Sequence, residues 1–140
     1  MKGNYRGFYK YDSERVQKKL GIDRTLFNIE ITETEGQAIS GLVEDDLNTK
    51  GTPGVGSVSG KFHGGNISFV KQMPVSTSIG PNGEITTHPN RMHPKIYYEG
   101  IEVEEGLFRG FWKMKFGFQF FGIFLQLFIP ASGTWEMQRY

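Results

Sequence analysis

The sequence predicts an all-β protein: an antiparallel up-and-down β-barrel of about eight strands, with one short helix between the first two strands. Three observations predict it. Segments that alternate between apolar and polar residues recur along the chain, as they do in half-buried strands. Turn signals separate these segments at the short spacing of a meander. A five-residue phrase with a central glycine and large or apolar outer residues recurs six times.

The repeated phrase places a glycine on the buried face of one strand after another. Side chains alternate between the two faces of a strand, so the glycine shares its face with the two outer residues. Glycine weakens a strand and is kept where strands bend sharply or where something approaches closely. A small, tightly coiled barrel needs such glycines. The phrases are Tyr5–Tyr9, Ile39–Val43, Val58–Phe62, Phe108–Trp112 and, more loosely, Tyr98–Glu102 and Ala131–Trp135.

The period-two signal predicts the strands in chain order, with tight hairpin connections at Glu35-Gly36, His63–Asn66 and Glu104–Gly106. Strands joined in this way form an antiparallel meander. The expected strands are Gly3–Tyr11, Leu26–Glu33, Gln37–Glu44, Val55–His63, Asn66–Lys71, Lys95–Val103, Gly106–Lys115 and Gly133–Arg139.

A helix of about two turns is expected between the first two strands. Asp12 or Ser13 can cap it, Val16 and Leu20 share one of its faces, and Gly21 can end it. A helix of this length is unstable alone. We therefore expect it to pack at one open end of the barrel.

The segment Met73–Pro94 contains four prolines, and its middle is nearly symmetric about Pro81-Asn82-Gly83. These three residues favour a turn, and the threonines and isoleucines on both sides favour strands. We interpret the segment as a polar hairpin arm, with a flexible loop as the alternative.

The segment Phe116–Ile129 carries no charge, and from Phe120 onward it is apolar on every side. Periodicity does not distinguish strand from helix in such a run, and it is too short to span a bilayer as a helix. Burying a phenylalanine is worth about 1.5–3 kcal/mol. We therefore expect this segment to lie in a subunit interface or across a barrel end, which predicts a homo-oligomer rather than membrane contact.

Composition narrows the function classes. With 140 residues the chain is expected to form a single domain, 1–140. A net charge of +1 gives no electrostatic reason to expect a nucleic-acid partner. The chain has no cysteine, which excludes disulfides and thiolate sites and fits a reducing compartment. We expect a cytoplasmic protein with no membrane span.

The meander, the Gly-x-aromatic phrases and the closing Gly133–Arg139 segment with its Gly-x-Trp pair resemble the calycin architecture of lipocalins, avidins and fatty-acid-binding proteins. The resemblance implies a barrel that can hold a small apolar ligand. The Gly-x-Trp pair lies here in the last strand, whereas lipocalins carry it in the first. No ligand-binding residues are transferred from these families, and the resemblance is one of architecture.

Motifs for catalysis, metals or cofactors are weak. We expect no metal site and no cofactor, and the sequence does not identify catalytic residues. His88 and His93 form a poor metal pair, which favours solvated loop histidines. The acidic runs Glu44–Asp46 and Glu102–Glu105 lie beside turns, which favours a solvated rim over general acid/base work. No nucleophile elbow, phosphate loop or zinc helix is found in the sequence.

Three functions stay open. The first is binding of a small apolar or aromatic ligand inside the barrel. The second is a filled-core structural or interaction protein that homo-oligomerises through residues 116–129, and the third is an enzyme with Tyr, Arg and Glu at the mouth. The glycine phase places Phe27, Ile29, Ile31, Ile39, Val43, Val58, Phe69, Phe108, Met114 and Met137 inside, together with the expected ligand-binding residues Tyr5, Tyr9, Phe62, Tyr98, Trp112 and Trp135.

Overall fold

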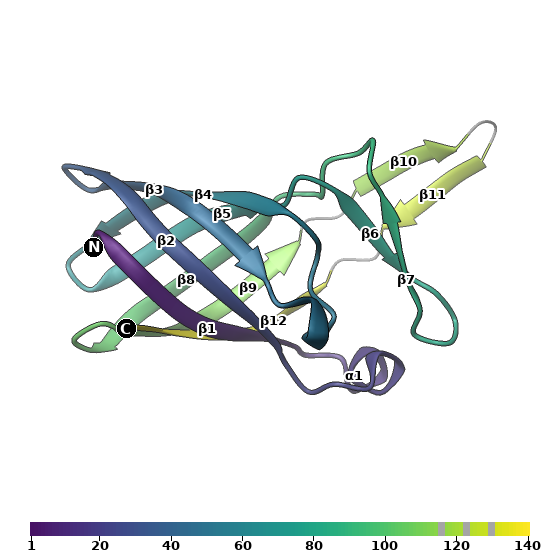
Figure 1. The fold of residues 1–140 in the computed structure, drawn as a ribbon, viewed down its shortest axis with the longest axis horizontal. Coiled ribbons are helices and arrows are strands. Elements are labelled where there is room, and N and C mark those ends of the chain that lie inside the picture. Colours follow the sequence, from purple (N-terminus) through teal and green to yellow (C-terminus); the bar gives the residue numbers. More distant parts are fainter. Residues whose placement is uncertain (115–116, 122–123, 129–130) are drawn as a thin grey trace.

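A computed structural model describes residues 1–114, 117–121, 124–128 and 131–140 and contains a closed antiparallel barrel of eight strands (Figure 1). Around the barrel the strands follow the order β1-β12-β9-β8-β5-β4-β3-β2. The predicted fold class is confirmed, and the barrel is consistent with a calycin-like architecture. The barrel strands are β1 (Gly3–Tyr11), β2 (Thr25–Glu35), β3 (Ala38–Asp45), β4 (Val55–His63), β5 (Asn66–Gln72), β8 (Ile96–Glu104), β9 (Leu107–Met114) and β12 (Ser132–Arg139).

The two ends of the barrel differ (Figure 1). At one end, the plain end, tight turns join β2 to β3, β4 to β5 and β8 to β9, and the first and last residues lie beside them. At the other, the elaborated end, the connections contain the helix α1, the 3-10 turn η1 (Leu47–Thr49) and two additional hairpins. Most of the chain outside the barrel strands therefore lies at the elaborated end.

Helix α1 (Glu14–Leu20) begins and ends at residues that the sequence indicates. Ser13 is the N-cap, and its side-chain oxygen accepts a hydrogen bond from the Val16 amide. Gly21 ends the helix in the left-handed conformation, with φ of 71°, which glycine adopts without steric cost. The predicted helix between the first two strands is confirmed.

The predicted arm is a hairpin of β6 (Ser76–Ile79) and β7 (Ile85–His88). It rises from β5 and β8, which lie across the barrel from β1 and β2, the strands that α1 connects. A Cβ added at Gly83 would collide with the carbonyl oxygen of Lys19. The turn of the arm therefore packs on the C-terminal end of α1, and the arm reaches across the elaborated end of the barrel.

The phenylalanine-rich segment contains a second hairpin, formed by β10 (Gly117–Phe121) and β11 (Phe124–Phe128). The sequence left strand and helix open for this segment, and the structure has strands. Within the described residues these two strands pair with each other and with no barrel strand. The burial of this segment depends on side chains that lie outside what the structure describes, as do the terminal residues Phe116 and Ile129. That expectation stays a prediction.

Inside the barrel the repeated glycines face the core, as the phrases predict. A Cβ at Gly41, Gly60 or Gly110 would collide with a backbone carbonyl oxygen of the neighbouring strand. In two other phrases the glycine makes room for an indole ring. A Cβ at Gly133 would crowd Trp112, and a Cβ at Gly100 would crowd Trp135. Glycine is thus needed because tightly coiled strands leave no volume for a side chain.

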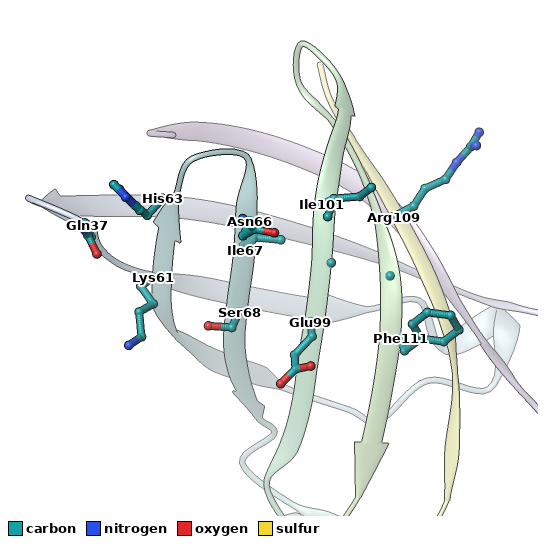
Figure 2. A pocket seen from close by; sticks show the side chains of 12 residues that line it. Gln37, Lys61, His63, Asn66, Ile67, Ser68, Glu99, Ile101, Arg109 and Phe111 are labelled. Atoms are coloured by element: carbon teal, nitrogen blue, oxygen red, sulfur yellow. The ribbon is translucent and has the colours of Figure 1, made fainter.

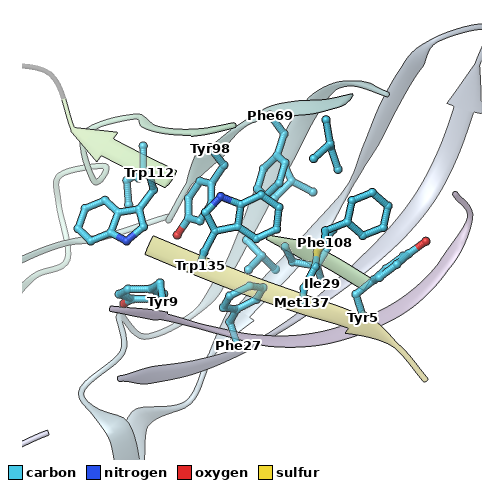
Figure 3. Packing of buried hydrophobic residues seen from close by; sticks show 14 of the residues in the cluster. Tyr5, Tyr9, Phe27, Ile29, Phe69, Tyr98, Phe108, Trp112, Trp135 and Met137 are labelled. Carbon is cyan, nitrogen blue, oxygen red and sulfur yellow. The ribbon is translucent and has the colours of Figure 1, made fainter. Parts of the chain in front are cut away.

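Aromatic rings fill much of the interior (Figure 3). Phe69 and Tyr98 stack with their centroids 4.8 Å apart, and the Trp135 ring meets both edge-on. The indole nitrogen of Trp135 donates to the carbonyl oxygens of Glu99 and Phe111, both at 3.1 Å. The buried hydrophobic residues are Tyr5, Tyr9, Phe27, Ile29, Ile31, Ile39, Val43, Val58, Ile67, Phe69, Met73, Ile96, Tyr98, Phe108, Trp112, Trp135 and Met137.

Candidate functional site

A buried ion pair lies inside the barrel near its elaborated end. Lys71 Nζ is 2.5 Å from Asp45 Oδ1, and the two side chains are 2% and 1% exposed. Asp45 is the last residue of β3 and Lys71 the penultimate residue of β5. Each lies two residues beyond an inward-facing residue, Val43 or Phe69, so strand alternation turns both side chains into the barrel.

Further donors hold the Asp45 carboxylate. Its Oδ2 atom accepts the Tyr9 hydroxyl at 3.4 Å and the Thr52 amide at 3.2 Å. The segment after η1 approaches closely, because a Cβ at Gly51 would collide with the Cβ of Asp45. One carboxylate oxygen is thus fixed by the loop and β1, and the other faces Lys71.

The Lys71 ammonium lies against aromatic rings. Nζ is 4.6 Å from the ring centroid of Tyr9 and 5.7 Å from that of Phe27. Cation–π attraction compensates part of the lost hydration. Burial nevertheless lowers the pKa of Lys71 below its ordinary value, and the neighbouring Asp45 opposes this shift. The pair thus consists of a desolvated amine and an anchored carboxylate.

Tyr98, on β8, carries a buried hydroxyl for which the described residues provide no hydrogen-bond partner. Burial raises the pKa of Tyr98 well above its ordinary value, and the nearby Asp45 and Tyr11 raise it further. A buried polar group without a partner costs about 1–3 kcal/mol. The hydroxyl thus lies near enough to Asp45 to feel its charge, and it carries the cost of an unpaired buried group.

Tyr11 and Trp112 complete the aromatic wall at this end. Trp112 meets Tyr9 and Tyr11 edge-on, with centroids 5.8 and 5.2 Å apart, and its indole nitrogen donates to the Lys10 carbonyl at 3.0 Å. Burial, and secondarily Asp45, raises the pKa of Tyr11 to about 12. Trp112 is thus packed against Tyr9, whose hydroxyl binds the Asp45 carboxylate.

His93 stands at the base of the arm, next to the same cluster. Its amide donates to the Met73 carbonyl at 3.2 Å, and its Nδ1 is 2.8 Å from the Pro94 carbonyl oxygen. Burial lowers the pKa of His93, and the positive charge of Lys71 lowers it further, against the opposing effects of Pro94 and Asp45. The prediction of a solvated loop histidine is wrong for His93, because the side chain is half-buried at the base of the arm.

The six predicted interior residues divide into two groups, and Figure 3 labels all of them except Phe62. Tyr9 contacts both members of the ion pair, and Trp112 packs on Tyr9. Tyr98 feels the charge of Asp45, and Trp135 packs on the Tyr98 ring. Tyr5 and Phe62 lie toward the plain end, where both rings pack on Phe108 with centroids 6.0 and 5.6 Å away. All six side chains face the interior, but they do not form one site.

The prediction of a solvated rim at Glu44–Asp46 is wrong for Asp45, which is buried and ion-paired. Lys71 was not predicted as an interior residue at all. The alternation of side chains along the strands could have indicated that both residues face inward. Asp45 follows the inward-facing residues Ile39, Gly41 and Val43 at the same spacing, and Lys71 follows Ile67 and Phe69. Within the described residues, no group of three or more His, Cys, Asp or Glu could hold a metal ion.

A groove of about 650 Å³ lies on the outer face of the barrel, away from the cluster (Figure 2). Side chains of β4, β5, β8 and β9 line it, including Lys61, Glu99, Arg109 and Phe111, the last of which is 72% exposed. The groove carries side chains of both charges, and the outer surface of the sheet forms its base. The groove offers no buried polar atom of the kind found inside the barrel.

Comparisons of the chain with protein-family models, curated proteins and solved structures find no match. Of the helices that the structure describes, none has the length and apolar character needed to cross a membrane.

Proposed function

We propose that this protein binds a neutral small molecule with an apolar or aromatic body and one polar atom, held inside the elaborated end of a calycin-like barrel. The ligand's polar atom meets the Tyr98 hydroxyl, and its body lies against Tyr9, Tyr11 and Trp112. The arm covers the ligand from the solvent side.

The buried Tyr98 hydroxyl is the observation that carries this proposal. The described residues give it no partner, although the neighbouring Tyr9 and the indole groups of Trp112 and Trp135 are all hydrogen-bonded. Ligand sites are mostly apolar with a few convergent polar groups, which is the composition of this region. A ligand atom that hydrogen-bonds Tyr98 would remove the cost of the unpaired hydroxyl.

The charge balance of the cluster favours a neutral ligand. Lys71 and Asp45 neutralise each other at 2.5 Å in a buried setting. An ionised ligand would add a third buried charge with no opposite charge to pair with, at a cost of several kcal/mol. Alcohols, phenols, aldehydes and ketones with apolar bodies satisfy this condition, whereas fatty-acid carboxylates do not.

Tryptophan fluorescence tests the proposal, because Trp112 lies in the wall of the site. The protein is titrated with matched pairs of ligands, such as an aromatic alcohol and the corresponding carboxylate. We expect saturable quenching by the neutral member of a pair and at least tenfold weaker binding of the anion. Absence of both a fluorescence response and a thermal shift across the neutral ligands would contradict the proposal.

Two tyrosine variants make the test specific to the site. Tyr98→Phe removes the unpaired hydroxyl and is expected to weaken binding about three- to tenfold, the effect of one hydrogen bond between neutral groups. Tyr5→Phe is the matched control, because Tyr5 lies in the same interior near the plain end and its hydroxyl donates to the Met1 carbonyl. Equal effects of the two variants would show that binding does not involve Tyr98.

A second function, homo-oligomerisation through the segment 116–129, is favoured by the isolation of β10 and β11. These strands pair with each other and with none of the other described strands, and the segment carries no charge. Phe121→Asp and Phe124→Asp place a charge on this segment, and sedimentation should show at least one variant as a monomer or unfolded. If both keep the wild-type mass and fold, the interface proposal is wrong. The lack of cysteine agrees with the cytoplasmic location that the sequence predicts.

A further inference from the structure

We infer that Lys71 forms an imine with an apolar aldehyde, with Asp45 as the base that frees the amine and as the counter-ion of the product. This inference rests on the proposed function, since an aldehyde is one of the neutral molecules expected at the elaborated end. It names the ligand's reactive group and gives the ion pair a chemical role.

The choice of lysine is the first argument. A buried ion pair contributes little net stability, and arginine makes the stronger, two-pronged contact with a carboxylate. Lysine differs from arginine in having a primary amine that becomes a nucleophile toward carbonyl carbon when it is desolvated. Lys71 is fully buried against the rings of Tyr9 and Phe27, in surroundings of that kind.

The position of Asp45 is the second argument. An ammonium must lose a proton before it can attack a carbonyl, and the acceptor must lie within hydrogen-bond reach. Asp45 Oδ1 is 2.5 Å from Lys71 Nζ, while Oδ2 is held by the Tyr9 hydroxyl and the Thr52 amide. The carboxylate is therefore fixed with one oxygen directed at the amine.

The reaction balances without another reagent. Asp45 takes a proton from the Lys71 ammonium, and the free amine adds to the aldehyde carbon to give a carbinolamine. Asp45 returns its proton to the departing hydroxyl, the C–O bond breaks, and water leaves as the C=N bond forms. An aldehyde and an ammonium thus become a protonated imine and one water molecule, with no change in oxidation state.

The charges are the third argument. Before the reaction the positive charge is on Lys71 nitrogen, and in the product it is on the same nitrogen, now part of the iminium. Asp45 faces that nitrogen in both states, so no new buried charge is created. The burial that lowers the pKa of Lys71 also favours the free amine needed for the attack.

Reductive trapping tests the inference. The full chain is incubated with cinnamaldehyde at neutral pH, treated with cyanoborohydride, digested and analysed by mass spectrometry. The Lys71 peptide should gain the mass of the aldehyde less its oxygen, at least tenfold faster than the peptide containing Lys61. Lys61 is the matched control, since it is exposed on β4 and lines the outer groove. Equal or slower labelling of Lys71 overturns the inference.

Variants separate the roles of the two residues. Lys71→Arg keeps the charge but lacks a reactive amine, and should lose the fast-labelled site. Asp45→Asn removes the group that accepts the proton and returns it to the departing hydroxyl, and should slow labelling of Lys71 about 100-fold. We expect this loss to exceed the gain in free amine that follows when Asp45 no longer stabilises the ammonium. Labelling of Lys71 in Asp45→Asn at the wild-type rate overturns the role of Asp45. If Asp45→Asn does not fold, the wild-type spectrum decides: a protonated conjugated imine absorbs at longer wavelength than the aldehyde, and absence of that band overturns the inference.

Cinnamyl alcohol distinguishes this inference from the proposed function. If the alcohol quenches tryptophan fluorescence but the aldehyde does not label Lys71, the imine is wrong and the binding function stands. If neither compound binds nor reacts, and the other neutral ligands also fail, the binding function is wrong as well.

Discussion

Tyr5 and Tyr9 stand on the same face of β1, four residues apart, and serve opposite ends of the barrel. At the plain end Tyr5 packs on Phe108, and its hydroxyl donates to the Met1 carbonyl. At the elaborated end Tyr9 contacts Trp112, and its hydroxyl donates to a buried carboxylate. Tyr5 thus packs in an apolar part of the core, whereas Tyr9 contacts a buried ion pair.

The comparison of the two ends distinguishes the contacts that fold the barrel from features that folding does not require. Aromatic packing and tight turns suffice at the plain end. At the elaborated end the chain buries an ion pair and leaves the Tyr98 hydroxyl without a partner in the described structure. Both features cost free energy that apolar residues of similar volume would save. Costs of this kind concentrate at functional sites.

The largest effect is expected from breaking the ion pair. Lys71→Met leaves the Asp45 carboxylate buried and unpaired, and should lower the free energy of unfolding by about 3–5 kcal/mol. The double variant Lys71→Met/Asp45→Asn removes both charges and keeps an acceptor for Tyr9 and Thr52, so it should recover most of that loss. Urea unfolding measures both variants. A double variant as unstable as the single one would mean that the pair itself stabilises the elaborated end.

The strand glycines between the two ends should be intolerant of side chains. Gly110→Val directs a side chain at the Glu99 carbonyl and should destabilise the barrel by about 1–3 kcal/mol or more. Phe111→Val, next in the same strand and 72% exposed, is the matched control and should change stability by less than about 0.5 kcal/mol. Thermal unfolding of the two variants compares them. Similar midpoints would contradict the close approach of β8 and β9 at Gly110.

Removing a hydroxyl should have opposite effects at the two ends. Tyr98→Phe eliminates an unpaired buried group and should stabilise the ligand-free protein by about 1 kcal/mol. Tyr5→Phe eliminates a hydrogen bond to Met1 and should destabilise it by a similar amount, about 0.5–1.5 kcal/mol. Urea unfolding without ligand gives the sign. A loss of stability in Tyr98→Phe would show that its hydroxyl is satisfied in solution.

The smallest effect concerns pH and is also expected at the elaborated end. Because burial lowers the pKa of His93 in the folded protein, the unfolded chain takes up its proton first as the pH falls below 6.5. The contribution of His93 to stability is therefore present above pH 6.5 and is lost as the pH falls through the lowered folded pKa. His93→Gln should reduce the loss of stability between pH 7.5 and 5, measured by urea unfolding.

His63→Gln is the control for that measurement, because His63 is exposed at the plain end. It should leave the pH dependence as it is in the wild type. If His93→Gln and the wild type lose the same stability on acidification, the histidine at the arm base is solvated in both states.

Most of the fold was predictable because period-two alternation and turn residues report strands directly. The expected start and end of β1 and β4 agree with the structure, and the cap residues Ser13 and Gly21 delimit α1 as expected. Pro81-Asn82-Gly83 predicted the arm, but not that Gly83 packs on α1. That contact depends on which strands lie opposite each other in the closed ring, which is a property of the tertiary structure.

The candidate site was less predictable, because residue type and strand phase disagree there. Val43 and Phe69 mark the inward phase, and the same phase continues to Asp45 and Lys71. Their charge indicates solvent, since unpaired Asp and Lys are rarely buried. The conflict disappears only when the two are paired, and they are 26 residues apart on strands separated by β4. Sequence spacing alone does not reveal such a partner.

The pairing of β1 with β12 has a consequence for how the chain folds. Tyr5 is paired with Arg139, and the Trp112 indole reaches the Lys10 carbonyl across 102 residues of chain. Contacts between residues so far apart in the sequence form only after the intervening chain is ordered, and they slow folding. During synthesis the meander from β2 to β5 can assemble early, while β1 has no second neighbour until the last strand emerges. Until that moment both edges of the growing sheet are open to pairing with other chains.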